Sequence, residues 1–170
     1  MNVPLLGWDY AGKMPPRVGL NHPSIAPYGA YPTQEGGETL ISIQNEREFV
    51  RLAAEVLGHP NMPTDPKFHN NEARCANRPA LDEIVSAAFT SVDRETLIAR
   101  LRSAGIAFGE VNDVAGLSNH PALRRVEVGS PTGPVAMAAP PARIDGEDRD
   151  LGPIPAIGEH TEAIREEFEA

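Results

Sequence analysis

The sequence has one cysteine, few aromatic residues and no long hydrophobic run. Cys75 cannot form a disulfide within the chain, and no metal-type ligands flank it in sequence. No segment approaches the ~20 apolar residues that a membrane-spanning helix needs. The start of the chain lacks the charged and apolar regions of a signal peptide. These absences predict a protein of the reducing cytoplasm that does not enter the membrane.

Positive charge is also scarce. The chain has 15 Lys and Arg residues against 24 Asp and Glu residues, which gives a formal net charge of −9. Phosphate backbones are bound by clustered Lys and Arg, so nucleic acid is excluded as a partner and an anionic membrane surface is disfavoured. An anionic small ligand is not excluded, because a local pocket can hold one whatever the net charge.

Glycine and proline are abundant, at 15 and 17 of 170 residues, and they are densest in residues 1–34. Proline fixes its own φ and pushes the preceding residue towards extended geometry, so this segment is predicted to be an extended arm. Its apolar residues include Trp8, Tyr10 and Tyr31. A free linker does not need such side chains, so we expect the arm to lie against another surface.

Regular elements begin after the arm. Asn45 is expected to cap a helix that starts at Glu46 and stops at Gly58, and Asp93 to cap one that ends at Gly105. The other elements predicted here are strands at 39–43 and 106–111, a loop at 59–69, a helix at 78–89, helical turns from 112 or 113 and from 120, a hairpin of 126–128 with 134–137, and a terminal helix after 158.

These elements predict three parts. Residues 1–34 form the extended arm, residues 35–130 a small α/β domain, and residues 131–170 a second extended segment. Extended flanks of this kind dock elsewhere, which indicates that the chain belongs to something larger.

Several local motifs, in order along the chain, resemble the class III CoA-transferases (the CaiB/BaiF family). They are PRVGLNHPSIAPYG at 16–29, ISIQNEREF at 41–49, DPKF at 65–68 followed by Asn71, Arg74, Asn77 and Arg78, GI at 105–106 with Gly109 and VN at 111–112, HPAL at 120–123, PIP at 153–155 and GEHT at 158–161. Each motif alone is common, but their shared order across nearly all 170 residues resembles the C-terminal portion of that family.

The resemblance implies a fold that composition does not show. Members of the family have a large Rossmann-like domain, a small α/β domain and a C-terminal segment that returns to the large domain, and two subunits interlock as a homodimer. Here the large domain is expected to be mostly absent, residues 1–34 to be the interdomain arm, and residues 131–170 to be the returning segment. A separate chain carrying the Rossmann-like half is the other partner that we expect.

The resemblance also implies chemistry. In the family an aspartate carboxylate attacks the acyl-CoA thioester, giving an acyl anhydride and then an enzyme-bound CoA thioester. That aspartate lies upstream of the matching segment, so the isolated chain is expected to be inactive. Coenzyme A thioesters and carboxylic acids are the implied substrates, and no cofactor or metal is expected.

Glu46 is the candidate catalytic residue. It occupies the position where the related α-methylacyl-CoA racemases place an acidic residue used in proton exchange, and a carboxylate there can act as a base if its pKa is raised. The alternative is that Glu46 is a first-turn glutamate stabilised by the helix dipole.

His22, Pro27 and Tyr28 are the candidate substrate-binding residues. By the resemblance, the loop at 22–27 corresponds to a glycine run that covers the active aspartate in some formyl-CoA transferases. The prolines of this chain predict a fixed wall of the acyl pocket instead of a mobile lid. The alternative is that these residues only pack the arm.

The remaining polar motifs are expected to be structural. The spacing of His59, His69 and His120 does not suit a metal. His160 is expected to cap or position the last helix, and Arg124 and Arg125 either meet CoA phosphates or lie on the surface.

The sequence therefore predicts part of a CoA-transferase that moves CoA between an acyl-CoA and a short-chain carboxylic or dicarboxylic acid. The alternatives are a fragment of an α-methylacyl-CoA racemase, and a non-catalytic subunit or remnant that needs a separate chain.

Overall fold

A computed structural model describes residues 2–147 and 149–169, which fall into two compact units, 1–111 and 112–170. The first unit contains α1 (Asn2–Ala11), β1 (Tyr28–Pro32), β2 (Glu38–Ser42), α2 (Glu46–Arg51), the π-helix η1 (Leu52–Val56), the 3-10 helix η2 (Met62–Thr64), α3 (Asn71–Ala76), α4 (Arg78–Thr90), α5 (Arg94–Ser103) and β3 (Phe108–Glu110). The second contains α6 (Val114–Ser118), β4 (Arg125–Val128), β5 (Val135–Ala138) and α7 (Thr161–Phe168).

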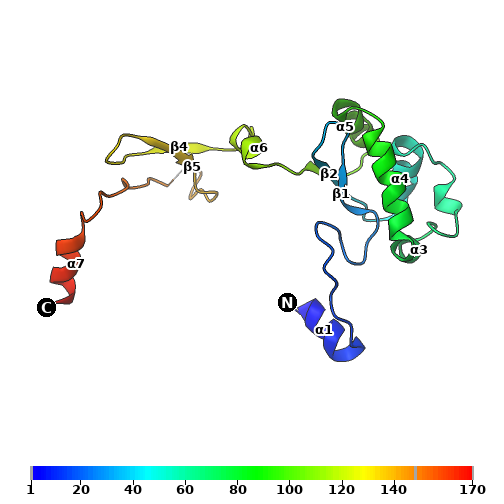
Figure 1. The fold of residues 1–170 in the computed structure, drawn as a ribbon, viewed down its shortest axis with the longest axis horizontal. Helices are drawn as coiled ribbons and strands as arrows, with labels where there is room; N and C mark the ends of the chain where they lie inside the picture. The colour runs from blue at the N-terminus through cyan, green and yellow to red at the C-terminus, as the bar shows by residue number, and fades with distance from the viewer. Residues whose placement is uncertain (1, 148, 170) are drawn as a thin grey trace. The chain divides into compact units, whose positions relative to one another are not determined.

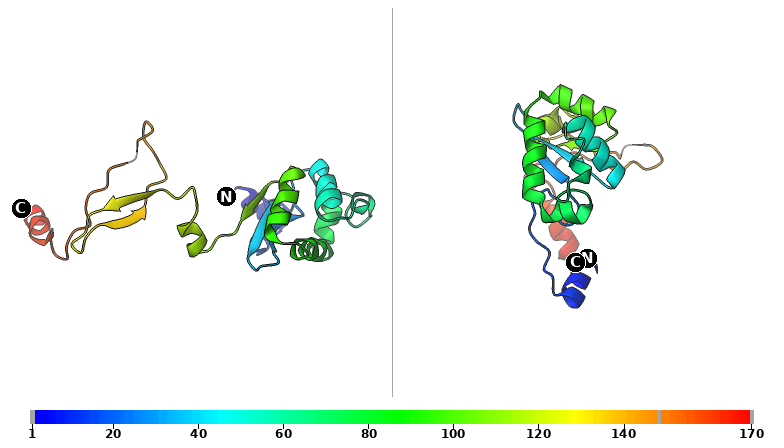
Figure 2. Two further views of the ribbon diagram at one scale, coloured as in Figure 1. Left: turned by 90° about the horizontal axis from the view of Figure 1, so that it is seen from above. Right: turned by 90° about the vertical axis from the view of Figure 1, so that its right-hand side faces the viewer.

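A three-stranded antiparallel sheet, in the order β1-β2-β3, is the base of the first unit (Figure 1). Leu40 of the middle strand lies opposite Ala30 of β1 and Gly109 of β3. Alternate residues of β2 differ in burial, with Thr39 and Ile41 fully buried and Leu40 partly exposed. Helices α2–α5 lie on one side of the sheet (Figure 2), so the unit is a small α/β domain with a one-sided core.

The first helical run confirms the predicted boundaries. The side chain of Asn45 accepts a hydrogen bond from the Glu48 amide at 3.0 Å and so caps α2. The run continues as η1, and Gly58 ends it with a φ of 74°, a left-handed geometry that favours glycine. The whole run from α2 to η1 buries Phe49, Leu52 and their neighbours against the sheet.

The next helices form the rest of the core. The predicted helix at 78–89 is α4, and the predicted cap of the following helix is confirmed, because Asp93 accepts from the Thr96 amide at 2.7 Å. The sequence did not predict α3, which Asn70 caps through the Ala73 amide at 2.8 Å. The buried apolar residues of these helices are Leu81, Val85, Phe89, Leu97 and Leu101.

The prediction that residues 1–34 lack regular structure is wrong in two places. Residues of α1 form a helix in which Pro4 falls in the first turn, the part of a helix where proline is tolerated. β1 is a full partner of β2, and its Tyr31 is buried and donates to Asp82 of α4 at 2.7 Å. The pKa of Tyr31 is raised, mainly by burial and then by this hydrogen bond, so the phenol stays protonated as the donor. The compact unit therefore includes β1, which precedes residue 35.

The second unit is built on the predicted hairpin. Val126 of β4 lies opposite Met137 of β5 in an antiparallel pair. The predicted domain of 35–130 included β4, but its ladder partner is β5, so the compact unit that holds β4 begins at Asn112. The helical turn expected at 120 is a single turn closed by the Leu123 amide and the His120 carbonyl at 2.9 Å. The predicted turn at 113 and the terminal helix are present as α6 and α7.

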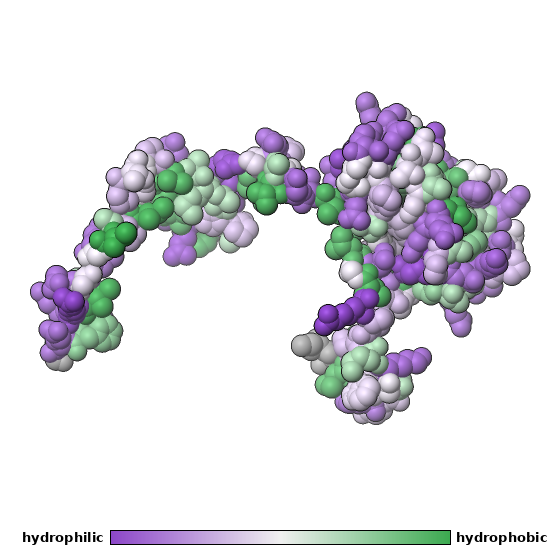
Figure 3. All heavy atoms as spheres, viewed as in Figure 1, coloured by the Kyte–Doolittle hydropathy of each residue, from purple (hydrophilic) through white to green (hydrophobic). Residues whose placement is uncertain are grey.

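The helices at the two ends of the chain carry exposed apolar side chains (Figure 3). In α1 these are Val3, Leu5, Leu6, Trp8 and Tyr10, and in α7 they are Ile164 and Phe168. No helix within the described residues is long and apolar enough to cross a membrane. Within their own compact units, the apolar side chains of both helices are at least half exposed.

Candidate functional site

The loop that carries three of the predicted site residues doubles back on itself between Asn21 and Gly29. The His22 amide donates to the Tyr28 carbonyl at 2.9 Å, and the two rings stack with centroids 5.2 Å apart. A Cβ at Gly29 would lie 1.8 Å from Oδ1 of Asn21, so this close approach requires glycine. Local hydrogen bonding thus brings His22 and Tyr28 together as one partly exposed aromatic pair.

Glu46 lies at the first position of α2. The carboxylate of Glu48, two residues later, accepts from the Gln44 amide at 2.8 Å and from the Asn45 side chain at 2.9 Å, so Glu48 serves the helix cap. The carboxylate of Glu46 is left to face α3, where its partner is Arg74.

Arg74 is a buried arginine whose side chain is 2% exposed. Its Nη1 and Nη2 donate to the two carboxylate oxygens of Glu46 at 2.7 and 3.0 Å, the two-pronged geometry of strong charge-assisted pairs. Its Nε donates to the Ala26 carbonyl at 2.6 Å, and Nη1 also donates to the Phe68 carbonyl at 3.2 Å. The guanidinium lies 4.1 Å from the ring centroid of Phe49. Arg74 therefore connects the loop, α2 and α3.

This pairing sets the charge of Glu46. The hydrogen bonds from Arg74 hold the pKa of the Glu46 carboxyl below its ordinary value, and partial desolvation opposes them only in part. A base for proton exchange at neutral pH needs the opposite shift. The racemase-like role of Glu46 stays a prediction, and the arrangement is the one expected of the alternative, in which Glu46 is an ionised first-turn glutamate held by a salt bridge.

A hollow of about 170 Å³ opens beside this ion pair. Its lining residues are Ile25, Ile43, Gln44, Asn45, Glu46, Asn71 and Arg74. The loop contributes Ile25 to it, so the structure brings the predicted loop and Glu46 to one place. His22, Pro27 and Tyr28 are not part of its lining.

Pro27 differs from the other candidate residues because it is fully buried. Its carbonyl accepts from the Ile43 amide at 3.2 Å, which joins the loop to the residue after β2. A side chain without exposed surface cannot touch a ligand, so in this chain Pro27 acts as packing for the loop. His22 and Tyr28 keep partly exposed rings and stay candidate contacts.

Two more side chains hold the same loop. Asn71 accepts from the Ala26 amide at 3.1 Å and donates to the Ser24 carbonyl at 2.9 Å. Arg78 donates through Nη2 to the His22 carbonyl at 2.8 Å and to the Ile25 carbonyl. Asn71 and Arg78 therefore bind main-chain groups between His22 and Ala26, N-terminal to the Ala26 carbonyl that Arg74 binds.

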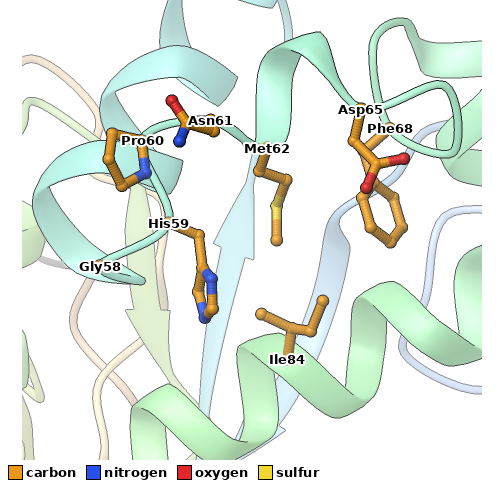
Figure 4. Close-up of a pocket in the computed structure, with 8 residues that line it drawn as sticks. All are labelled: Gly58, His59, Pro60, Asn61, Met62, Asp65, Phe68 and Ile84. Atoms are coloured by element: carbon orange, nitrogen blue, oxygen red, sulfur yellow. The ribbon is translucent and has the colours of Figure 1, made fainter.

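A larger hollow of about 370 Å³ lies away from the loop, between η2 and α4 (Figure 4). Met62 and Ile84 are part of its apolar wall, and its polar side chains include His59 and Asp65. In Figure 4 the His59 ring and the Asp65 carboxylate lie on opposite sides of Met62, so they do not form an acid-base pair. This hollow contains none of the sequence-predicted site residues.

The other polar motifs have structural partners. Arg125 donates to the Ser118 carbonyl at 3.2 Å, and Arg124 donates to the Pro140 carbonyl at 2.7 Å. His160 is at the start of α7, but its side chain makes no capping hydrogen bond. Among the residues that the structure describes, no group of three or more His, Cys, Asp and Glu side chains is arranged to hold a metal ion.

Sequence reasoning missed the roles of Asn71, Arg74 and Arg78. The sequence shows them as parts of a family-like motif, but it does not show that they bind the loop. The spacing of Asn71 and Arg74, three residues apart on one face of α3, was a local signal for those two, whereas Arg78 begins the next helix. Their partners lie 45 to 56 residues away, which no local pattern reveals.

Most of the chain is similar to known proteins. The chain is 31% identical to an acetyl-CoA:oxalate CoA-transferase of Acetobacter aceti over 98% of this chain and 43% of that protein. It is 27% identical to a succinyl-CoA:glutarate CoA-transferase of Mus musculus over 89% of this chain and 36% of that protein. The chain thus spans less than half the length of these relatives.

A solved structure of a CaiB/BaiF family protein from Brucella suis has a similar fold. The TM-score is 0.73 at 29% identity, over 96% of this chain and 43% of that one. Residues 1–161 match the family described as CoA-transferase family III, which is nearly the whole chain. By this match, and by the small α/β domain that it shares with the solved structure, the chain belongs to CoA-transferase family III.

Proposed function

We propose that this chain forms the small-domain side of an enzyme that transfers CoA between an acyl-CoA and a short-chain carboxylic or dicarboxylic acid. Family membership supports the reaction class. The names of the relatives include oxalate and glutarate, both of them dicarboxylic acids, which supports a short-chain dicarboxylic acid within the proposed substrate class. The observation that carries the choice of a transferase is the pairing of Glu46 with Arg74.

The chemistry needs a nucleophile outside the segment that this chain matches. An aspartate carboxylate attacks the thioester carbon, releasing CoA thiolate and leaving an acyl anhydride. The thiolate then attacks the aspartyl carbonyl of the anhydride, which releases the free acid and leaves an aspartyl-CoA thioester. The acceptor carboxylate repeats the two steps in reverse. No proton is removed from carbon, so the reaction has no need of a base at Glu46.

We assign binding roles, not bond-making roles, to this chain. The loop at 22–27 forms a wall of the acyl site, with the stacked rings of His22 and Tyr28 as its contacts. Ile25 adds an apolar side chain beside the ion pair. Coenzyme A enters as substrate, and the reaction requires no other cofactor.

The exposed apolar faces of α1 and α7 support a partner for this chain. We propose that they dock on a Rossmann-like large domain, which a longer polypeptide, the second subunit of an interlocked homodimer or a separate chain supplies. Apolar patches of this kind, when left exposed, drive association.

A transfer assay tests the proposed function. The chain is combined with a Rossmann-like half of the same family and incubated with acetyl-CoA or succinyl-CoA and a panel of acids that includes oxalate and glutarate. We expect new acyl-CoA to appear with one acid in the panel, and no stereochemical inversion of a 2-methylacyl-CoA. Inversion without CoA transfer would show that the racemase alternative is right. Binding of the half without either reaction would identify a non-catalytic subunit.

A further inference from the structure

Five main-chain groups of residues 22–26 are bound by only three side chains. Asn71 binds the Ala26 amide and the Ser24 carbonyl, Arg74 binds the Ala26 carbonyl, and Arg78 binds the carbonyls of residues 22 and 25. All three side chains come from α3 and the first residue of α4. We call them the loop clamp.

We propose that Asn71, Arg74 and Arg78 are positioning residues that hold residues 22–26 in one conformation, as a fixed wall beside the hollow at Glu46. The effect of this fixed conformation on catalysis rests on the proposed function, whereas the existence of the fixed conformation does not. None of the three needs to touch the reacting atoms, because they act through the backbone of the loop.

The hydrogen-bond inventory of the loop supports a single conformation. A mobile lid would have to break these five bonds together. The cost is highest at the buried Ala26, because a buried main-chain group that loses its partner costs free energy. Pro23 within the clamped stretch and Pro27 directly after it also restrict φ. Ala26, the last residue of the clamped stretch, is itself fully buried.

Glu46 also supports the loop clamp. Both carboxylate oxygens bind the guanidinium that also holds Ala26, and this two-pronged contact fixes the plane of the Arg74 head group. The carboxylate therefore acts on the loop through Arg74. Its side chain is 54% exposed, so it orients the arginine from the solvent side of the hollow.

Site-resolved hydrogen exchange of the full 170-residue chain tests the clamp directly. The Ala26 amide is the probe, because its acceptor is the Asn71 side chain. Asn71→Ala removes that acceptor, and we expect exchange at Ala26 to accelerate about tenfold or more. Asn71→Asp keeps an acceptor but loses the donor to Ser24, so Ala26 is expected to stay within about threefold of the original rate. The amides of α5 serve as the internal reference.

Matched variants separate the clamp from general stability. Glu72→Ala changes the exposed neighbour of Asn71 on the same helix, and Arg47→Lys is the control for Arg74→Lys. The two controls are expected to leave Ala26 unchanged. The lysine ammonium in Arg74→Lys cannot bind Glu46 and Ala26 as the planar guanidinium of arginine does. This substitution is therefore expected to accelerate exchange of the Ala26 amide severalfold. Equal acceleration at Ala26 and in α5, or no acceleration at Ala26, would overturn the proposal.

A second arm measures the catalytic consequence in the preparation that transfers CoA. Asn71→Ala is expected to lower kcat/KM for the acyl donor about tenfold, with partial recovery in Asn71→Asp. Unchanged kinetics in a variant whose loop exchanges faster would overturn the positioning role. If the original chain supports no transfer at all, the proposed function fails and the role in catalysis fails with it, while the exchange result still decides whether the loop is clamped.

Discussion

Two helices of this chain carry the same kind of apolar stripe, but the stripe is buried in one helix and exposed in the other. In α4 the stripe of Leu81, Val85 and Phe89 is fully buried against the sheet and its neighbouring helices. In α7 no residue is buried, and Phe168 is 80% exposed. A helical stripe thus identifies the face that must be covered, but it does not identify what covers it.

The same contrast separates the two compact units. The first unit has a continuous core that includes Ile41, Phe49 and Leu101. In the second unit Val128 is the buried apolar residue among those the structure describes. The first unit therefore has the means to fold on its own, whereas the helices at the two ends of the chain bury little of their apolar surface.

The largest effect is expected from a matched pair of phenylalanine substitutions. Phe89→Ala removes a fully buried ring and should cost about 3–5 kcal/mol of unfolding free energy, because it leaves a cavity. Phe168→Ala removes an exposed ring and should change stability by less than about 0.5 kcal/mol. Denaturant unfolding at low protein concentration measures both. Similar losses in the two variants would contradict the contrast between α4 and α7.

A smaller loss is expected at Arg74. Arg74→Ala leaves the carbonyls of Ala26 and Phe68 without this donor and should cost about 2–3 kcal/mol. Glu46 is half exposed, so water can solvate the carboxylate that is left. Arg47→Ala, at an exposed position in α2, is the control and should be nearly neutral. A neutral Arg74→Ala would show that the ion pair contributes nothing to the fold.

Self-association follows from the exposed faces. The isolated chain should sediment as a mixture of monomer and larger species, because Trp8 and Phe168 are apolar and exposed at 54% and 80%. The double variant Trp8→Ser and Phe168→Ser should shift the distribution towards monomer by about tenfold in the association constant. Sedimentation velocity over a range of concentrations decides it. A clean monomer before any substitution would show that the faces need no cover.

The smallest effect concerns pH. The pKa of Glu46 is below its ordinary value of 4.5 in the folded chain, so its contribution is fully present above that value and is lost as the pH falls through the folded pKa. Glu46→Gln should therefore be less stable than the original chain at pH 7, by under about 1 kcal/mol, and the difference should shrink as the pH falls below 4.5 and vanish below the folded pKa. Urea unfolding across this range, with Glu83→Gln as the control, measures it. A stability difference that widens on acidification would contradict the lowered pKa of Glu46.

Local chemistry was enough to predict the middle of the chain. Caps at Asn45, Asp93 and Asp113 and the left-handed stops at Gly58 and Gly105 are determined by a few neighbouring residues, and each was found where expected. The hairpin in the second unit was predicted for the same reason, since a short turn sets its register.

Elements that depend on distant partners were not predicted. The strand β1 contains Gly29 and ends at Pro32, so its own sequence looks like a loop, and only pairing with β2 makes it a strand. The helix α1 was hidden by Pro4 and Gly7. The loop clamp joins residues about 50 positions apart, so sequence spacing alone could not assign its function.

The central claim is that this chain supplies binding surface and loop geometry to a CoA-transferase while the nucleophile lies outside it. The most direct measurement is CoA transfer by the purified 170-residue chain alone, from succinyl-CoA to a panel of carboxylic acids. We expect no turnover above the uncatalysed rate, because the carboxylate that lines the proposed site, that of Glu46, is held by Arg74. Robust turnover by the chain alone, abolished by substitution of one of its own carboxylates, would contradict it.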